Sequence, residues 1–248
     1  MIEIHGVKKR LGGRQVLNGV ALDVRTGETV VVLGPSGTGK SVLLKHILGL
    51  MAADEGSIQV DGEEIVGRKE AELNRIRRRF GMLFQGAALF DSMTVGENVA
   101  FPLRENRNLP EAEIQKRVRE RLEWVGLRDV ENAKPSSLSG GMRKRAGLAR
   151  AIAMDPQFML YDEPTTGLDP ITADVIDKLI RSLQQRMNVT SIIVTHDLKS
   201  AFKVGDRIAM LFDGKVVFSG TLDEVRNTPN PYLRQFMEGS SEGPIKPV

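Results

Sequence analysis

An eight-residue loop, residues 34–41, limits most strongly what this chain can fold into. It fits the pattern G-x-x-x-x-G-K-[ST], and it lies between an apolar run at residues 29–33 and a helical pattern that begins at about residue 40. Glycines let backbone N–H groups converge on a phosphate, and the N-terminus of the following helix favours an anion. The predicted phosphate-binding residues are Gly34, Pro35, Ser36, Gly37, Thr38, Gly39, Lys40 and Ser41.

A second apolar run, residues 158–161, leads directly into Asp162 and Glu163. A buried strand that ends in aspartate places this carboxylate beside the phosphate loop, so we expect Asp162 to hold Mg²⁺ through water. Glu163 is then placed to polarise an attacking water as a general base. In the phosphate loop, Lys40 is expected to reach the β- and γ-phosphates, and Ser41 to offer its hydroxyl to Mg²⁺.

The remaining periodicity predicts an α/β fold with a mostly parallel sheet. Strands at 29–33, 158–161 and 190–194 alternate with helices at about 40–50 and 170–187, which is typical of a parallel sheet. Residues 2–7 and 16–24 look like strands, and Asp61-Gly62 and Asp213-Gly214 are favoured hairpin turns, which predicts an antiparallel β subdomain. Thr221 and Glu224 have capping-box spacing.

The middle of the chain predicts an inserted helical subdomain at about residues 86–154. A charged helix is expected at about 69–79, a short strand at 80–84, and an amphipathic helix that begins near Pro110. We interpret the apolar stretch from Met82 to about Glu105 as a loop that suits a docking groove for a permease helix. The expected domain spans residues 1–237, and residues 238–248 form a tail rich in Gly, Ser and Pro.

Composition excludes several classes of function. The chain has no cysteine, so it has no disulfides, no thiolate catalysis and no zinc–cysteine site. A formal net charge of only +3 is poor support for nucleic-acid binding. No apolar stretch approaches the roughly 20 residues of a membrane span. Any contact with a membrane is therefore expected to occur through a partner.

The segment Leu138-Ser139-Gly140-Gly141-Met142, followed by a helix, resembles the signature motif of ATP-binding-cassette (ABC) ATPases. Ser139, Gly140 and Gly141 present small residues and a hydroxyl at a helix N-terminus, where a γ-phosphate can bind. In this family the motif completes the site of a partner subunit, so the resemblance implies a head-to-tail homodimer with two sandwiched ATP molecules. The implied fold is a P-loop NTPase of the ABC type.

Further motifs stand in the order of this family. Gln85 looks like the glutamine that contacts Mg²⁺ or the attacking water, and Asp169 lies in a segment similar to the loop that crosses the dimer interface. His196 looks like the switch histidine at the γ-phosphate. The resemblance therefore implies that Glu163, His196, Gln85 and Lys40 act in catalysis, and that Ser41, Gln85 and Asp162 hold Mg²⁺ with ATP.

Three positions differ from the family pattern. Leu11 stands near the place of an aromatic ring that stacks on adenine, which implies weaker stacking. Val42 replaces a hydroxyl that can contact the α-phosphate, and Met142 replaces the commoner glutamine of the signature. Because none of these changes removes a group needed for hydrolysis, we expect an active ATPase.

Four segments resemble the sequences of the ATPases of Mla-type phospholipid transporters: residues 82–90, residues 102–105, the signature, and the segment from Arg234 to Pro244. This resemblance implies an integral membrane permease of the MlaE kind, an MCE-domain protein and a small STAS-domain protein as partners. It also implies a peripheral position on the cytoplasmic face of the inner membrane, and transport of phospholipid between the inner and outer membranes.

Three alternatives stay open at this point. An ABC ATPase that serves another substrate would have the same core motifs. A non-transport ABC ATPase usually has two fused cassettes or a long coiled-coil insertion, and this chain has neither. A P-loop GTPase or small-molecule kinase would leave Ser139-Gly140-Gly141 unexplained, and the guanine motif N-K-x-D is missing from the sequence.

Overall fold

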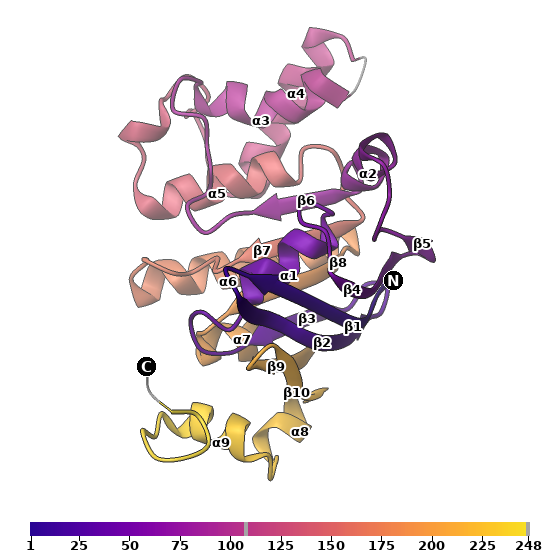
Figure 1. Ribbon diagram of the computed structural model, residues 1–248. Coiled ribbons are helices and arrows are strands. Elements are labelled where there is room, and N and C mark those ends of the chain that lie inside the picture. The colour runs from indigo at the N-terminus through magenta and orange to yellow at the C-terminus, as the bar shows by residue number, and fades with distance from the viewer. Residues whose placement is uncertain (107–108, 247–248) are drawn as a thin grey trace. The chain divides into compact units, whose positions relative to one another are not determined.

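The computed structural model describes residues 1–106 and 109–246. The chain forms two compact units, one made of Met1–Ile76 with the residues from Thr190 onward, and the other of Arg77–Val189. Figure 1 labels their helices and strands.

The first unit contains an antiparallel sheet with the strand order β2-β1-β4-β5. Its strands are β1 (Ile2–Leu11), β2 (Arg14–Val24), β4 (Glu55–Val60) and β5 (Glu63–Glu64). Asp61 and Gly62 both have positive φ, 48° and 79°, and connect β4 to β5, in which Val60 pairs with Glu63. The predicted hairpin and the predicted antiparallel β subdomain are thus confirmed.

The other strands of the first unit have the order β10-β9-β3-β8. They are β3 (Thr29–Leu33), β8 (Thr190–Thr195), β9 (Arg207–Phe212) and β10 (Lys215–Thr221). The central strand β3 is buried at every position, because its β-branched apolar side chains are covered on both faces. It pairs in parallel with both β8 and β9, so their carboxyl ends meet at one edge of the sheet.

Helices α1 (Lys40–Ile47), α7 (Leu198–Val204), α8 (Leu222–Arg226) and α9 (Pro231–Glu238) belong to the first unit, and α2 (Glu70–Arg77) lies at its boundary. The capping box of Thr221 and Glu224 is present at α8, as predicted. Helix α1 ends three residues before the predicted end at Leu50, because the chain turns at Gly49 with a φ of 60°.

The segment after α9 is held by one side chain. Gln235 is 6% exposed, and its Nε2 donates to the carbonyl oxygens of Ser240 (3.1 Å) and Ile245 (2.9 Å). The amide N of Ile245 donates in return to Oε1 of Gln235 at 2.7 Å. The predicted tail of residues 238–248 therefore packs on α9 over its described part, and residues 247–248 lie outside the described residues.

The second unit pairs β6 (Phe80–Leu83) in parallel with β7 (Phe158–Asp162). Between these strands in the sequence come α3 (Val95–Asn106), α4 (Glu111–Trp124), the short 3₁₀ helix η1 (Pro135–Ser137) and α5 (Gly140–Ala151), and β7 is followed by α6 (Pro170–Met187). Figure 1 shows α3, α4 and α5 next to one another. The predicted helix and strand at 170–187 and 158–161 are confirmed.

One prediction in the second unit is wrong. The stretch from Met82 to Glu105 was expected to be a loop, but Val95–Asn106 form helix α3. Thr94 and Glu97 form reciprocal hydrogen bonds at its N-terminus: the amide N of Thr94 donates to Oε2 of Glu97 at 2.6 Å, and the amide N of Glu97 donates to Oγ1 of Thr94 at 3.2 Å. This cap stabilises the helix although Gly96 and Pro102 lie within it.

The fold class is confirmed: an α/β protein with parallel and antiparallel strand pairing and helices between the strands. Among the described residues, no helix combines the length and the apolarity that crossing a membrane requires.

Candidate functional site

The phosphate loop begins where the buried strand β3 ends. Gly34 lies so close to β9 that a Cβ atom at this position would be 2.3 Å from the carbonyl oxygen of Leu211. Gly39 is the N-cap of α1 with a φ of 97°, and a Cβ atom there would be 3.0 Å from the carbonyl oxygen of Val16 in β2. Both glycines are therefore required by close backbone packing, and Gly39 also by its left-handed conformation.

Lys40 points back into this loop. Its side chain is buried, and Nζ donates to the carbonyl oxygens of Gly34 (2.7 Å) and Pro35 (2.9 Å). The hydroxyl of Thr38 also donates to the carbonyl oxygen of Pro35, at 2.9 Å. A cation thus lies inside a turn at a helix N-terminus, and both features favour an anion such as a phosphate.

His196 lies at the same edge of the sheet as the phosphate loop. In the parallel pair β3–β8, Leu33 is opposite Thr195, so the chain leaves both strands at one level, into Gly34 and into His196. His196 is exposed. The structure therefore brings together these two predicted parts of the site within the first unit.

Leu11 belongs to the hairpin beside this loop. It is 37% exposed at the end of β1 and pairs with Arg14 of β2, the strand whose Val16 carbonyl oxygen leaves no room for a Cβ atom at Gly39. Its side chain can cover a flat ring by apolar contact, but it offers no aromatic face.

In the second unit, Asp162 ends β7 and Gln85 follows β6 by two residues. Leu83 of β6 is opposite Tyr161 of β7, so Gln85, Asp162 and Glu163 emerge at one edge of this strand pair. Glu163 has a φ of 48°, a left-handed conformation that costs about 1–3 kcal/mol in a residue with a side chain. The hydroxyl of Thr166 donates to Oε2 of Glu163 at 3.0 Å, which orients the carboxylate.

The residues of the predicted signature and Asp169 lie together in the second unit. Ser139 is the N-cap of α5, and its hydroxyl accepts from the amide N of Met142 at 3.2 Å. A Cβ atom at Gly141 would be 2.5 Å from Cγ2 of Thr172, and one at Gly140 would be 3.4 Å from Leu168. The two glycines therefore let the start of α5 approach the start of α6.

Asp169 has a structural function that the sequence reasoning did not predict. It is the N-cap of α6, and its carboxylate accepts from the amide N atoms of Ile171 and Thr172, both at 3.0 Å. Hydrogen bonds from the Thr172 side chain and backbone lower the pKa of this exposed carboxyl group. Asp169 therefore fixes the beginning of α6 beside the signature residues.

The predicted metal ligands supply a hydroxyl, an amide and a carboxylate oxygen, which are hard donors of the kind that Mg²⁺ prefers. Ser41 belongs to the first unit, and Gln85 and Asp162 to the second. Within residues 1–106 and 109–246, His, Asp and Glu side chains form no cluster of three or more that could hold a metal by itself. Their oxygen chemistry suits Mg²⁺, which usually binds through few protein ligands and keeps water and phosphate oxygens.

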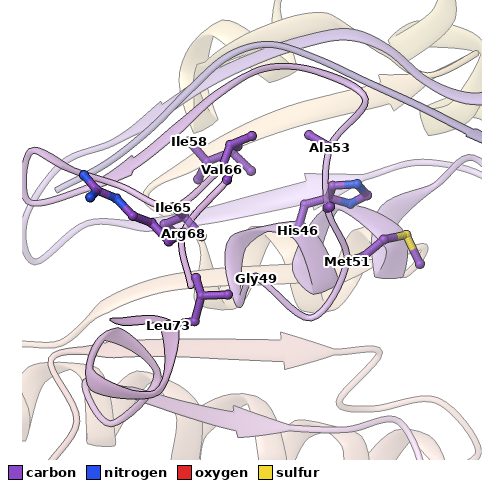
Figure 2. A pocket seen from close by; sticks show the side chains of 11 residues that line it. His46, Gly49, Met51, Ala53, Ile58, Ile65, Val66, Arg68 and Leu73 are labelled. Carbon is purple, nitrogen blue, oxygen red and sulfur yellow. The ribbon is translucent and has the colours of Figure 1, made fainter. Parts of the chain in front are cut away.

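The first unit also contains a pocket of about 170 Å³ that involves none of the predicted site residues. Figure 2 shows that side chains from α1, β4 and α2 surround it, among them His46, Ile58 and Leu73. His46 is 1% exposed and its Nδ1 lies 2.7 Å from the carbonyl oxygen of Val42. Burial lowers the pKa of His46.

Sequence reasoning missed two cations on α5. Nζ of Lys144 donates to the carbonyl oxygens of Gln85 and Glu163, and the guanidinium of Arg150 donates to those of Ala87 (3.0 Å) and Ala88 (2.7 Å). The basic run at residues 143–145 was visible in the sequence, but nothing in it indicated which of its members turns inward.

Comparison with known proteins agrees with this arrangement. The profile described as "ABC transporter" matches residues 17–166. The chain is 45% identical over 244 residues to "Probable ribonucleotide transport ATP-binding protein mkl" of Mycobacterium leprae, covering 98% of this chain and 70% of that protein. It is 42% identical over 246 residues to "Intermembrane phospholipid transport system ATP-binding protein MlaF" of Haemophilus influenzae, covering 99% of this chain and 93% of that protein. It is 41% identical over 245 residues to MlaF of Escherichia coli K12, covering 99% of this chain and 91% of that protein.

Solved structures of ATP-binding cassettes are also similar to this chain. A dimeric, post-hydrolysis state of the ATP-binding cassette MJ0796 bound to ADP and Pi superposes with a TM-score of 0.83 at 35% identity, covering 90% of this chain and 99% of that chain. The structure of cbiO1 from Clostridium perfringens, part of the transporter complex cbiONQ, has a TM-score of 0.84 at 29% identity and covers 92% of this chain and 91% of that chain.

Proposed function

This chain belongs to the ABC transporter family, and from that premise we propose that it is the ATPase subunit of a transporter that moves phospholipid between the inner and outer membranes. The observation that carries the ATPase function is the glycine loop at residues 34–41, which surrounds the buried Lys40 and lies at one sheet edge with His196. That loop binds phosphates in nucleotide enzymes.

In the proposed mechanism, the residues 34–41 bind the phosphates of ATP through backbone N–H groups, while Lys40 and His196 stabilise the charge that develops on them. Glu163, whose carboxylate is oriented by Thr166, directs a water molecule in line with the γ-phosphate. Ser41, Gln85 and Asp162 would hold Mg²⁺, which would supply positive charge to the phosphate oxygens.

We further propose a head-to-tail homodimer, in which Ser139, Gly140 and Gly141 of one copy complete the nucleotide site of the other. The exposed Ser139 and the loop at Asp169 lie side by side, so both can meet a facing subunit. Ile171, in the first turn of α6, is 80% exposed, which suits a surface that a second chain covers. The related cassette MJ0796 has a dimeric structure.

The proposed permease site is the surface beside Gln85. Phe84 and Phe90 are 38% and 42% exposed, and the Phe90 ring lies 5.1 Å from that of Phe101 on α3. Exposed aromatic side chains that are held by a packed neighbour suit the docking of an apolar helix. We propose that a permease of the MlaE kind docks here, and that the chain lies on the cytoplasmic face of the inner membrane only through such partners.

The remaining proposals follow from the resemblance to Mla-type ATPases and from the sequence pattern of this chain. An MCE-domain protein and a STAS-domain protein are proposed as further partners. The ATPase domain is proposed to span residues 1–237, and the helices between β6 and β7 to form the inserted helical subdomain at about residues 86–154. Residues 238–248 would then be a carboxyl-terminal tail.

Two substrates have support from named relatives. The mkl protein is named for ribonucleotide transport and MlaF for phospholipid transport. We favour phospholipid because the alignment spans 93% of MlaF but 70% of mkl, so that MlaF corresponds to this chain over nearly its whole length.

The test is a purification of the chain with its membrane partners, followed by reconstitution into vesicles. We expect ATP hydrolysis that Glu163→Gln abolishes, ATP-dependent movement of labelled phospholipid, and an MCE-domain protein in the complex. Ser139→Arg should retain ATP binding and lose turnover, because its signature surface serves the other copy. Uptake of ribonucleotide without movement of lipid would support the second substrate, and failure of the intact complex to hydrolyse ATP would reject the ATPase function.

A further inference from the structure

Lys144 is a cation inside the second unit. It lies in the second turn of α5 and is 5% exposed, although lysine is almost never fully buried unless it has polar partners. Its partners are two carbonyl oxygens: Nζ donates to the carbonyl oxygen of Gln85, and to that of Glu163 at 3.2 Å. Burial lowers the pKa of Lys144, and the carboxylates of Asp162 and Glu163 oppose that shift.

These two acceptors belong to different loops. Gln85 follows β6 and Glu163 follows β7, and the two strands are neighbours in parallel register. A single ammonium group on α5 therefore holds both loops at the edge where the strands end. The same helix begins with the signature residues Ser139 to Gly141, so Lys144 links three predicted parts of the site.

The backbone of Glu163 needs such a restraint. Its left-handed φ of 48° is unfavourable for a residue with a side chain, and such conformations persist when surrounding contacts hold them. Lys144 binds its carbonyl oxygen, and Thr166 binds the same residue twice, through N–H···O at 3.3 Å and through its hydroxyl. Removing the ammonium group would release one side of this arrangement and let the carboxylate rotate.

Helix α5 also holds the Gln85 loop further along. Ala87 and Ala88 have φ values of 62° and 50°, and Arg150 donates to the carbonyl oxygens of both. A Cβ atom at Gly147 would be 3.2 Å from Cβ of Ala87, so the loop lies directly on the helix. Arg150 thus fixes this loop without a contact to Glu163, whereas Lys144 holds Gln85 and Glu163 at once.

We propose that Lys144 is a positioning residue for ATP hydrolysis: its ammonium group, by binding the carbonyl oxygens of Gln85 and Glu163 together, sets the orientation of the Glu163 carboxylate and ties it to the Gln85 loop. This inference rests on the proposed ATPase function. It assigns Lys144 no contact with the nucleotide.

The test compares the purified ATPase–permease complex of the wild type with Lys144→Met, Lys144→Arg and Arg145→Met. Methionine keeps most of the length of the lysine side chain and loses the hydrogen-bond donors, whereas arginine keeps the donors. Arg145 is the matched control, because this neighbouring cation donates to the carbonyl oxygen of Gly126 at 2.9 Å, away from both loops. For each complex, kcat and KM for MgATP are measured, and the Kd for ATP is measured separately in the absence of Mg²⁺.

We expect Lys144→Met to lower kcat by about 10- to 100-fold, because a small displacement of a catalytic group has an effect of this size. The Kd for ATP should change by less than about threefold, since the proposed phosphate-binding residues 34–41 do not include Lys144. Lys144→Arg should recover most of kcat, and Arg145→Met should leave kcat unchanged. A loss confined to Kd, or a kcat for Lys144→Met within twofold of the wild type, would overturn the proposal.

If the methionine variant does not fold, Lys144→Gln replaces it in the test. The glutamine side chain is too short to bind the carbonyl oxygens of both Gln85 and Glu163. Faster amide hydrogen exchange at Thr166, whose N–H bonds to Glu163, is then expected, and unchanged exchange together with unchanged kcat would overturn the proposal. The experiment gives different results if the ATPase proposal is wrong and if only the Lys144 proposal is wrong. A wild-type complex without ATPase activity rejects the proposed function, whereas an active complex in which Glu163→Gln is dead and Lys144→Met is fully active rejects only the function of Lys144.

Discussion

At the scale of single residues, the site depends on close backbone packing. Gly34 shows this most clearly, because the carbonyl oxygen of Leu211 occupies the place that a side chain would take. The contact joins the start of the phosphate loop to the neighbouring strand β9. A larger residue must therefore move the loop or the strand, and both carry main-chain hydrogen bonds.

Gly34→Ala is expected to weaken ATP binding by about tenfold or more, because a loop displacement that costs about 1.4 kcal/mol of binding has that effect. Gly67→Ala is the matched control: Gly67 has a φ of 78° but nothing within 4 Å of its added Cβ atom, so only backbone strain of about 1–2 kcal/mol is expected there. Isothermal titration with ATP and thermal melting of both variants separate the two effects. Equal ATP affinity in the two variants would contradict the steric explanation.

His46 gives a second prediction at this scale. Burial lowers its pKa in the folded protein below the value of about 6.5 for an unfolded chain. The unfolded state therefore binds a proton more readily, so stability is full above pH 6.5 and is lost as the pH falls through that value.

The melting temperature of the wild type should fall between about pH 7.5 and pH 5.5, and the fall should be smaller in His46→Leu, which cannot titrate. Differential scanning calorimetry at both pH values measures the difference between the two proteins. Identical falls would show that other groups cause the acid sensitivity.

At the scale of elements, the sequence predicted best where local signals agreed. Strand β3 was predicted at its observed bounds because a continuous β-branched run fits a buried parallel strand. Helix α6 was predicted equally well, since its apolar residues recur at helical spacing from Pro170 to Met187. Helix α3 was missed because the stretch was interpreted as an apolar loop, although the capping-box pair Thr94 and Glu97 was visible.

In the candidate site too, the features with a local sequence signal were predicted, and those that depend on tertiary contacts were not. Motif order indicated which loops hold the proposed catalytic residues, because polar residues follow apolar strands at the sheet edge. The proposed function of Lys144 could not be predicted, since it depends on contacts with residues that are 59 and 19 positions away in the sequence. The left-handed conformation of Glu163 also has no local signal, because tertiary contacts hold it.

Helices α4 and α6 are joined by one aromatic ring. Trp124 lies between the guanidinium groups of Arg121, 3.9 Å from the ring centroid, and Arg186, at 3.8 Å. Trp124→Leu should destabilise the second unit by about 1–4 kcal/mol, because each cation–π contact contributes roughly 0.5–2 kcal/mol. Urea unfolding followed by circular dichroism measures this loss, and Trp124→Phe should lose less. A Leu variant as stable as the Phe variant would assign the contribution to apolar burial alone.

At the scale of the whole molecule, the residues proposed to act on ATP are divided between the two units. Lys40, Ser41 and His196 belong to the first unit, whereas Gln85 and Glu163 belong to the second. The sequence contains a single tryptophan, Trp124, so tryptophan fluorescence reports on the second unit.

In the Glu163→Gln protein, MgATP at about 100 times its Kd should stabilise the folded state by about 2.7 kcal/mol. The fluorescence midpoint of unfolding should rise with this shift, although the phosphate loop belongs to the other unit. Lys40→Ala in the same background is the control and should show no shift. A rise detected by circular dichroism but not by fluorescence would mean that the nucleotide stabilises only the first unit.

The Gln235 side chain has a consequence for how the carboxyl terminus can change. The side-chain amide of Gln235 makes three hydrogen bonds with the backbone of Ser240 and Ile245. A substitution of Gln235 that removes this amide is therefore expected to loosen the segment after α9 and to make it more accessible to proteases.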